Sequence, residues 1–125
     1  MKKIELNKAI CSISDDYIIT IVIPKNIEIE VDDVLAIRNA NEKLSNGKNY
    51  VVLVLVGEFS TISKEAREAT ATSDFGETRK AMAFIISSLP QRIVGNFFIN
   101  MNNPPTPTKI FNSKEEALAW LKNFQ

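Results

Sequence analysis

The strongest structural signal in this chain is its C-terminal segment, Pro104-Pro105-Thr106-Pro107-Thr108-Lys109-Ile110-Phe111-Asn112-Ser113-Lys114-Glu115-Glu116-Ala117-Leu118-Ala119-Trp120-Leu121-Lys122. It predicts a proline-stiffened lead-in, a short strand at 109–111 and a helix that begins after Ser113. Ser113 and Glu116 have the spacing of a capping box, which satisfies backbone donors at a helix start. Apolar residues then repeat at i, i+3, i+4 and i+7 and predict one buried stripe: Ala117, Trp120, Leu121 and Phe124. We therefore expect Trp120 to be largely buried.

Two apolar stretches precede this segment. Residues 92–99 predict a strand, and the stretch before them predicts a helix that is apolar at every position from 81 to 86. This helix is expected to begin at Asp74, which forms a second capping box with Glu77, and to end at Ser88 before a proline. The connection between the predicted strands is short for a crossover between parallel strands, which leaves the direction of the last strand open.

The first half of the chain predicts strands and helices in alternation. Residues 3–13 alternate unevenly and predict a strand with a register change or bulge, which pairs with a strand at 17–23 as an antiparallel hairpin. Helices are predicted at 32–46 and 63–72. Tyr50–Val56 is apolar at every position, as in the central strand of a largely parallel sheet. The order β-β-α-β-α-α-β-β-α predicts one α/β domain over residues 1–125, with a single-layer, mixed, mostly parallel sheet of about five strands and helices packed on it.

The composition excludes several classes of protein. Histidine is absent, which removes the Ser-His-Asp triad, the Cys-His pair and histidine-ligated metal sites. Fifteen basic residues balance fifteen acidic ones, so no global field favours nucleic acid. The single cysteine, Cys11, is expected to be a buried hydrophobe, and no glycine-rich loop suggests a phosphate-bearing cofactor. We expect no metal, no cofactor, no signal peptide and no membrane span, and a cytoplasmic location.

Three motifs and the predicted element order point to a known family: Ala66-Arg67, Asn103-Pro104-Pro105 and Phe111-x-Ser113-x-Glu115-Glu116-Ala117-x-x-Trp120-Leu121. In these features the chain resembles the small bacterial STAS/SEC14-like domains, which share the fold of the anti-sigma-factor antagonists. The resemblance covers most of the chain. It implies a fold, and it brings no catalytic signature with it.

The same resemblance draws attention to the segment after the predicted central strand. Anti-sigma-factor antagonists carry a regulatory serine, preceded by aspartate, where a central strand passes into a helix. Here the place reads Gly57-Glu58-Phe59-Ser60-Thr61-Ile62-Ser63, without the aspartate-serine pair. Ser60 and Thr61 are therefore candidate phosphosites by position alone. The simpler alternative is that Thr61 or Ser63 caps the following helix.

Two further groups of residues are candidates for binding. Arginines from neighbouring elements could gather at one end of the sheet and bind an anion, although solvated single charges are the simpler expectation: Arg67, Arg79 and Arg92. The apolar surplus of the predicted helix could form an interface or the wall of an apolar pocket: Met82, Phe84 and Ile86. We expect deep burial of this helix and a homodimer that uses its Phe84 side, with Phe97 or Phe98 nearby.

These observations favour a non-enzymatic, cytoplasmic regulatory or protein-binding module that acts through an unknown protein partner. The alternative is a carrier or sensor of a small apolar or lipid-like ligand, as the SEC14 half of the resemblance implies. That alternative requires a cavity between the sheet and the segment 82–86. An enzyme that uses only Ser, Asp and Arg ranks last, since the residues of the common catalytic sites are missing.

Overall fold

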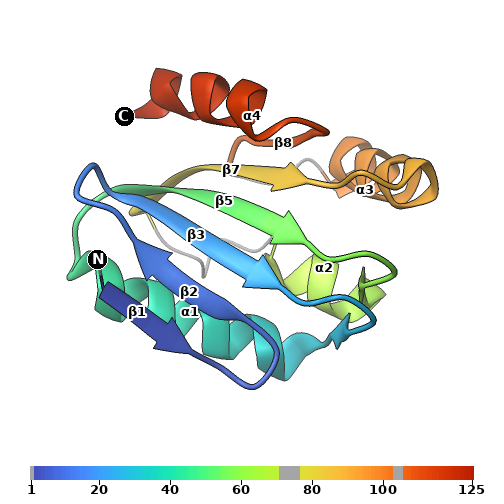
Figure 1. Cartoon of the computed structure of the whole chain (residues 1–125), viewed down its shortest axis with the longest axis horizontal. Helices are drawn as coiled ribbons and strands as arrows, with labels where there is room; N and C mark the ends of the chain where they lie inside the picture. Colours follow the sequence, from blue (N-terminus) through green and yellow to red (C-terminus); the bar gives the residue numbers. More distant parts are fainter. Residues whose placement is uncertain (1, 71–76, 103–105) are drawn as a thin grey trace.

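The computed structural model describes residues 2–70, 77–102 and 106–125. Its centre is a six-stranded sheet with the order β1-β2-β3-β5-β7-β8 (Figure 1). The strands are β1 Lys2–Glu5, β2 Ile10–Ile13, β3 Ile18–Ile23, β5 Tyr50–Val56, β7 Arg79–Ile85 and β8 Thr108–Phe111. Strands β1, β2 and β3 pair antiparallel, whereas β3, β5, β7 and β8 are parallel. The predicted α/β class with a mixed, mostly parallel sheet is confirmed.

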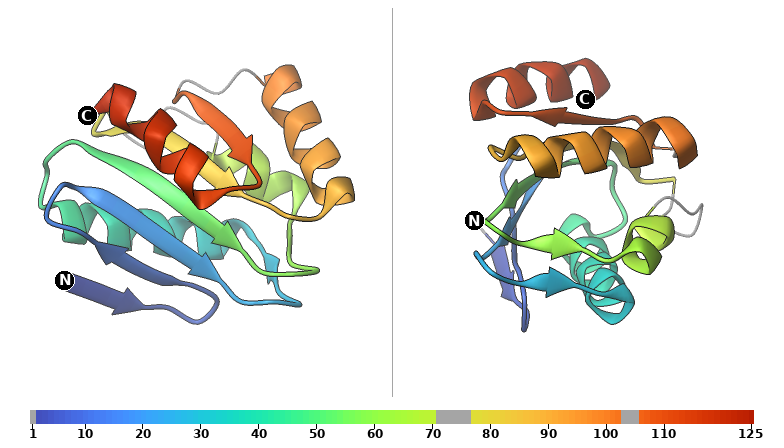
Figure 2. Two further views of the ribbon diagram at one scale, coloured as in Figure 1. Left: turned by 45° about the horizontal axis from the view of Figure 1, so that its top comes forward. Right: turned by 90° about the vertical axis from the view of Figure 1, so that its right-hand side faces the viewer.

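Helices cover both faces of this sheet. They are α1 Val31–Ser45, α2 Lys64–Thr70, α3 Leu89–Asn102 and α4 Lys114–Leu121, the last followed by a 3-10 turn, Lys122–Phe124. Helix α4 lies on one face, and α1 and α2 lie on the other (Figure 2). Helix α3 lies beside β8 on the α1 side, where it closes over Met82 and Phe84. A small parallel pair, β4 Glu28–Ile29 and β6 Thr61–Ile62, forms a second sheet.

Strand β5 has both of its faces covered, as its apolar composition predicts. Val52 and Val54 pack in the core cluster under α1. Val51 and Leu53 point the other way and pack with Leu121 of α4. All four valine and leucine side chains are buried, so the strand needs no polar face.

The predicted helix over 74–88 is wrong, because its apolar part is strand β7 between β5 and β8. Ala81 and Ala83 of this strand face α4, whereas Met82 and Phe84 face the opposite side. A strand covered on both faces needs an apolar residue at every position, so the surplus expected on a helix is ordinary core. The proposed helix start at Asp74 lies outside the described residues.

The predicted strand over 92–99 is also wrong, because these residues belong to helix α3. Pro90 does not end a helix here. It lies in the first turn of α3, where a backbone N–H has no partner within the helix, so the missing N–H of proline costs nothing. Ser88, which precedes the helix, accepts the N–H of Gln91 through its Oγ at 3.5 Å. Helix α3 supplies the long crossover that parallel strands require, so β8 runs parallel to β7. The observed order therefore differs from the predicted one in its second half.

The N-terminal segment differs from its prediction in one respect. Residues 3–13 form two strands, β1 and β2, which pair with each other as a hairpin. A tight turn joins them, in which the N–H of Leu6 donates to the carbonyl of Ala9 at 2.8 Å. This turn, rather than a bulge, explains why the apolar residues change parity. The predicted hairpin of β2 with β3 is confirmed.

At the C-terminus, the predicted start of the last helix is confirmed. Ser113 caps α4, with its Oγ accepting the N–H of Glu116 at 3.4 Å. Trp120 is half-buried rather than largely buried. Its ring lies 5.7 Å from that of Phe111 and 4.8 Å from that of Phe124, between centroids. This small aromatic group covers the edge of the core and leaves part of the indole in contact with water.

Candidate functional site

Three adjoining hollows lie between the sheet and the helices α1, α2 and α3. We name them the inner, middle and outer hollow, with volumes of about 50, 60 and 290 Å³. The inner and middle hollows share four wall residues: Ile62, Thr70, Met82 and Phe84. The middle and outer hollows share four others: Ile62, Arg67, Ile86 and Gly95. Side chains alone therefore separate one hollow from the next.

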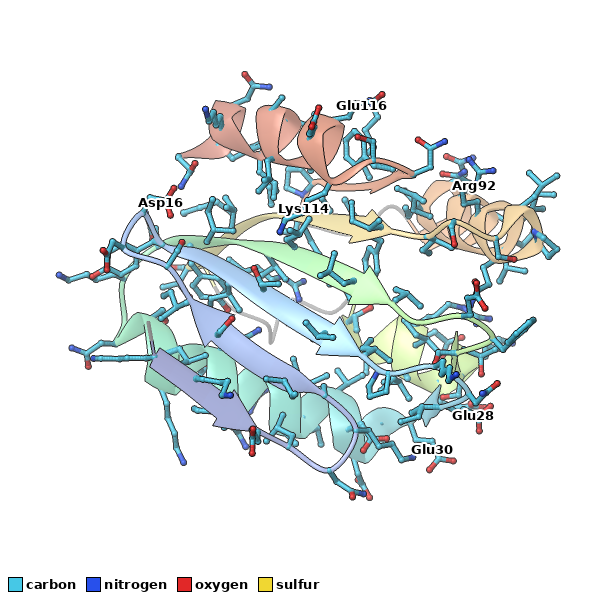
Figure 3. All side chains as sticks on the ribbon, in the orientation of Figure 1. Asp16, Glu28, Glu30, Arg92, Lys114 and Glu116 are labelled. Atoms are coloured by element: carbon cyan, nitrogen blue, oxygen red, sulfur yellow. The ribbon has the colours of Figure 1, made fainter. Side chains whose placement is uncertain are left out.

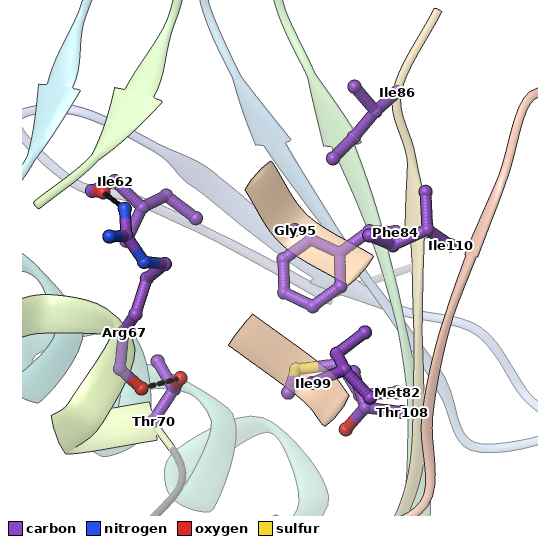
Figure 4. A pocket seen from close by; sticks show the side chains of 10 residues that line it. All are labelled: Ile62, Arg67, Thr70, Met82, Phe84, Ile86, Gly95, Ile99, Thr108 and Ile110. Atoms are coloured by element: carbon purple, nitrogen blue, oxygen red, sulfur yellow. Dashed lines mark hydrogen bonds between the residues drawn. The ribbon is translucent and has the colours of Figure 1, made fainter. Parts of the chain in front are cut away.

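The middle hollow brings together the three apolar residues predicted as an interface or pocket wall. Met82 and Phe84 alternate along β7, so they point to the same side, and Ile86 follows just beyond the strand (Figure 4). Helix α3 closes this hollow through Gly95, where a Cβ would meet the flexible end of the Ile110 side chain. The glycine thus allows the helix to approach β8 closely.

The inner hollow has a polar end inside otherwise apolar walls. Asn41 of α1 is 4% exposed, and its Oδ1 has no hydrogen-bond partner. Arg79 is 6% exposed and lines the same hollow. Its Nη2 donates to the carbonyl of Thr70 at 2.9 Å and to Thr106 Oγ1 at 3.2 Å. Burial lowers the pKa of Arg79, and the nearby Tyr50 opposes this shift.

A β-bulge determines the direction of Arg79. Tyr50 of β5 pairs with Arg79, but the next residue, Val51, pairs with Ala81, so Lys80 is the extra residue on β7. Strict alternation from Met82 would turn the side chain of Lys80, not that of Arg79, toward α1. The bulge reverses this order, so the guanidinium enters the hollow and the lysine is exposed.

The three predicted anion-binding arginines are not brought together in one hollow. Arg79 lines the inner hollow, and Arg67 lines the middle and outer ones, where its Nη1 donates to the carbonyl of Ile62 at 2.5 Å. Arg92 is carried by α3 and lines none of the three hollows (Figure 3). The three arginines therefore do not line a common hollow in which they could bind one anion together.

The two predicted phosphosites have different surroundings. Ser60 is 1% exposed; its hydroxyl donates to the carbonyl of Pro24 and accepts the N–H of Ile27 at 3.0 Å. Thr61 is exposed at the rim of the outer hollow. Ser63, and not Thr61, caps α2 by accepting the N–H of Ala66 at 3.1 Å. Ser60 thus ties two loops together, whereas Thr61 is open to solvent.

Asn41 is the site residue that the sequence analysis missed, although the sequence holds a signal for it. Val34, Ile37 and Leu44 mark the buried stripe of α1, and Asn41 occupies the remaining place at i, i+3, i+7 and i+10. A polar residue inside a buried apolar stripe requires a hydrogen-bond partner or has a functional role.

An apolar face of α3 is exposed beside the outer hollow, whose wall includes Val94 of this face. It consists of four large side chains: Leu89, Ile93, Val94 and Phe97. Phe84, which was predicted to lead a dimer contact, points into the hollow instead. Phe97 is 66% exposed, and the side chain of Phe98 lies outside the description. Of these two elements, α3 and not β7 therefore presents exposed large apolar side chains among the described residues.

A metal cluster and a membrane span are both absent from the part of the chain that the structure describes. No group of three or more acidic or cysteine side chains could hold a metal ion within the described ranges. None of the described helices has the length and apolar character needed to cross a bilayer. Cys11 is fully buried, and this burial raises the pKa of its thiol to about 11. That shift suppresses the thiolate on which reactivity depends.

Comparisons with known proteins agree with the fold. Residues 11–125 match a family described as a domain of unknown function, DUF7793. A solved structure from Shewanella loihica PV-4 is similar, with a TM-score of 0.67 and 19% sequence identity over 97% of this chain and 99% of that one. It is described as an uncharacterised protein of the DUF3478 family with a SpoIIAA-like fold. At this identity the likeness shows the fold alone, which confirms the resemblance to the anti-sigma-factor antagonist fold. No curated protein matches the chain.

Proposed function

The chain belongs to the DUF7793 family of unknown function, and from its own geometry we propose that it is a non-enzymatic module that binds a small apolar ligand. The observation that carries this proposal is the row of three adjoining hollows between the sheet and the helices α1, α2 and α3. The SEC14-like alternative required a cavity beside the segment 82–86. Met82, Phe84 and Ile86 line one.

The shape and chemistry of the hollows support a ligand of this kind. The outer hollow, at about 290 Å³, approaches the lower end of small-molecule sites, which begin at about 300 Å³. Its mouth lies between Thr61 and the first turns of α3, and its depth is set by Ile86 and Gly95. A ligand that entered there would remove apolar wall area from water. Each Å² of apolar area buried in this way stabilises the complex by about 25 cal/mol.

The proposal that the module performs no turnover is supported by the side chains around the hollows. Among the described residues that line them, arginine is the only ionisable type, and a guanidinium acts as a hydrogen-bond donor alone. A general base or an activated nucleophile requires a group that titrates near neutral pH or a neighbour that activates it. Binding without chemistry is the function that these walls support.

A matched pair of variants on α3 tests the proposal. Val94 lines the outer hollow, whereas its neighbour Ile93 lines none of the three and is similarly exposed. We expect wild type to bind the uncharged fluorophore N-phenyl-1-naphthylamine saturably. V94W should weaken this binding about tenfold or more, because the indole fills the mouth, and I93W should leave it unchanged. Absence of saturable binding, or equal losses in both variants, would contradict the proposal.

A second proposal is self-association through α3, with a second copy of this chain as the partner. It is supported by the exposed face of Leu89, Ile93, Val94 and Phe97 and by the zero net charge, which offers no long-range repulsion. We expect a dimer in sedimentation at micromolar concentration, and I93K should shift it to monomer. L35K, which adds the same charge on the exposed part of α1, should leave it a dimer. A monomeric wild type would refute this second proposal.

A further inference from the structure

The inner hollow contains an acceptor that the fold leaves unsatisfied. Asn41 sits in the apolar stripe of α1, and its Oδ1 is buried without a hydrogen-bond partner. Replacing this asparagine by leucine would complete the stripe with a side chain of similar size. A buried polar atom without a partner costs folding free energy, so its presence points to a donor that arrives from outside the chain.

The hollow around this acceptor restricts what the donor can be. Apart from Asn41, Thr70 and Arg79, the described residues of its walls are apolar, with Met82 and Phe84 on the side of the middle hollow. Arg79, which the bulge on β7 turns inward, lines the same hollow, and its Nε and Nη2 donate to Thr106 Oγ1 and to the carbonyl of Thr70. A group that pairs with Asn41 must therefore donate a hydrogen bond and fit among largely apolar walls.

We infer that the ligand of this module is a single-chain apolar molecule with a terminal hydroxyl, whose O–H donates to Asn41 Oδ1. This inference rests on the proposed ligand-binding function and names the class of ligand. The apolar tail extends from the inner hollow through the middle one to the outer mouth. The flexible side chain of Met82 lies at the first of these boundaries and can move aside.

Hydroxyl chemistry fits Asn41 better than the other common head groups. A carboxylate accepts hydrogen bonds but has none to donate, so it leaves Oδ1 of Asn41 unsatisfied. An ether has the same limitation and carries no charge. A hydroxyl is both donor and acceptor, and it enters an apolar channel at a smaller desolvation cost than a charged group.

The experiment compares three ligands of equal chain length: decan-1-ol, decyl methyl ether and decanoate. Each displaces N-phenyl-1-naphthylamine from wild type, N41L and the control S45A. Ser45 is a buried polar residue of the same helix that lines none of the hollows. We expect wild type and S45A to bind the alcohol about tenfold more tightly than the ether, the value of one hydrogen bond to a buried acceptor. N41L should bind the two equally.

The outcomes separate this inference from the function on which it rests. Equal affinity of wild type for alcohol and ether, or tighter binding of decanoate than of the alcohol, overturns the hydroxyl assignment and leaves ligand binding standing. If wild type binds neither the fluorophore nor any of the three ligands, both proposals fail. The wild-type comparison alone decides the matter if N41L does not fold.

Discussion

The hydroxyl group of Ser60 makes two hydrogen bonds to the backbone of another loop. It lies where the resemblance to anti-sigma-factor antagonists suggested a regulatory serine, yet it links the loops after β3 and β5 through Pro24 and Ile27. A kinase would have to break both hydrogen bonds to reach it. Thr61, one residue later, is exposed. If this segment is phosphorylated, Thr61 is the accessible position.

Cys11 leads to a prediction about stability at high pH. Burial raises the pKa of its thiol from 9.0 to about 11, so between these values the unfolded chain loses a proton that the folded chain keeps. The free energy of unfolding should therefore fall as pH rises from 9 to 11, by up to about 2–3 kcal/mol.

Urea unfolding of wild type and C11A across this range measures the effect. The alanine variant controls for other groups that titrate there, such as Tyr50, whose pKa burial also raises. As the pH increases, the free energy of unfolding of wild type should fall relative to that of C11A. A difference that stays constant with pH would contradict this prediction.

Two elements of this fold approach each other only because a glycine lies between them. Gly57 follows β5, and its N–H donates to the carbonyl of Ile23 at the end of β3 at 2.8 Å. A Cβ at this position would lie 2.5 Å from the backbone nitrogen of Lys25 and from the backbone carbon of Pro24. Backbone cannot rotate away as a side chain can, so the ends of the two strands would have to separate.

We therefore expect G57A to destabilise the protein by roughly 1–3 kcal/mol, the usual range for overpacking. G95A is the control. Its Cβ meets only the end of the Ile110 side chain, which can change rotamer, and alanine favours a helix over glycine by about 1 kcal/mol. Its net effect should be close to zero. Chemical unfolding of both variants gives the comparison, and equal destabilisation would show that the strand ends are not held as described.

At the scale of the whole molecule, the two faces of the sheet depend on different helices. Helix α4 is the helix whose side chains pack in the core cluster of Val51, Leu53, Ala81 and Ala83, whereas α1 packs on the opposite side. Strand β1 is an edge strand whose residues are mostly exposed. The C-terminal segment should therefore matter much more to folding than the N-terminal one.

Deletion of residues 113–125 should abolish the cooperative unfolding transition, because it exposes the apolar face of β5 and β7 to water. Deletion of residues 2–8 should preserve a cooperative transition at lower stability. Circular dichroism during thermal unfolding distinguishes these results. A cooperative transition after the C-terminal deletion would mean that the core under α1 is sufficient for folding.

Local sequence signals predicted the elements whose side-chain pattern has only one interpretation. Ser113 caps α4 as expected, and the apolar run of β5 is a central strand. The α/β class followed from these elements, since a strand covered on both faces requires helices on either side. Met82, Phe84 and Ile86 line one hollow, although the sequence analysis placed them on a helix where the structure has strand β7.

What the sequence alone determined about this protein is its class of fold, its capped terminal helix and the absence of histidine chemistry. The tertiary structure decided whether the apolar run at 81–86 is helix or strand, because a run without polar residues has no periodicity to distinguish them. It also decided that Arg79 and Asn41 line the same hollow. That arrangement depends on the bulge in β7 and on the packing of α1 on the sheet, which are long-range relations between segments that no local pattern encodes.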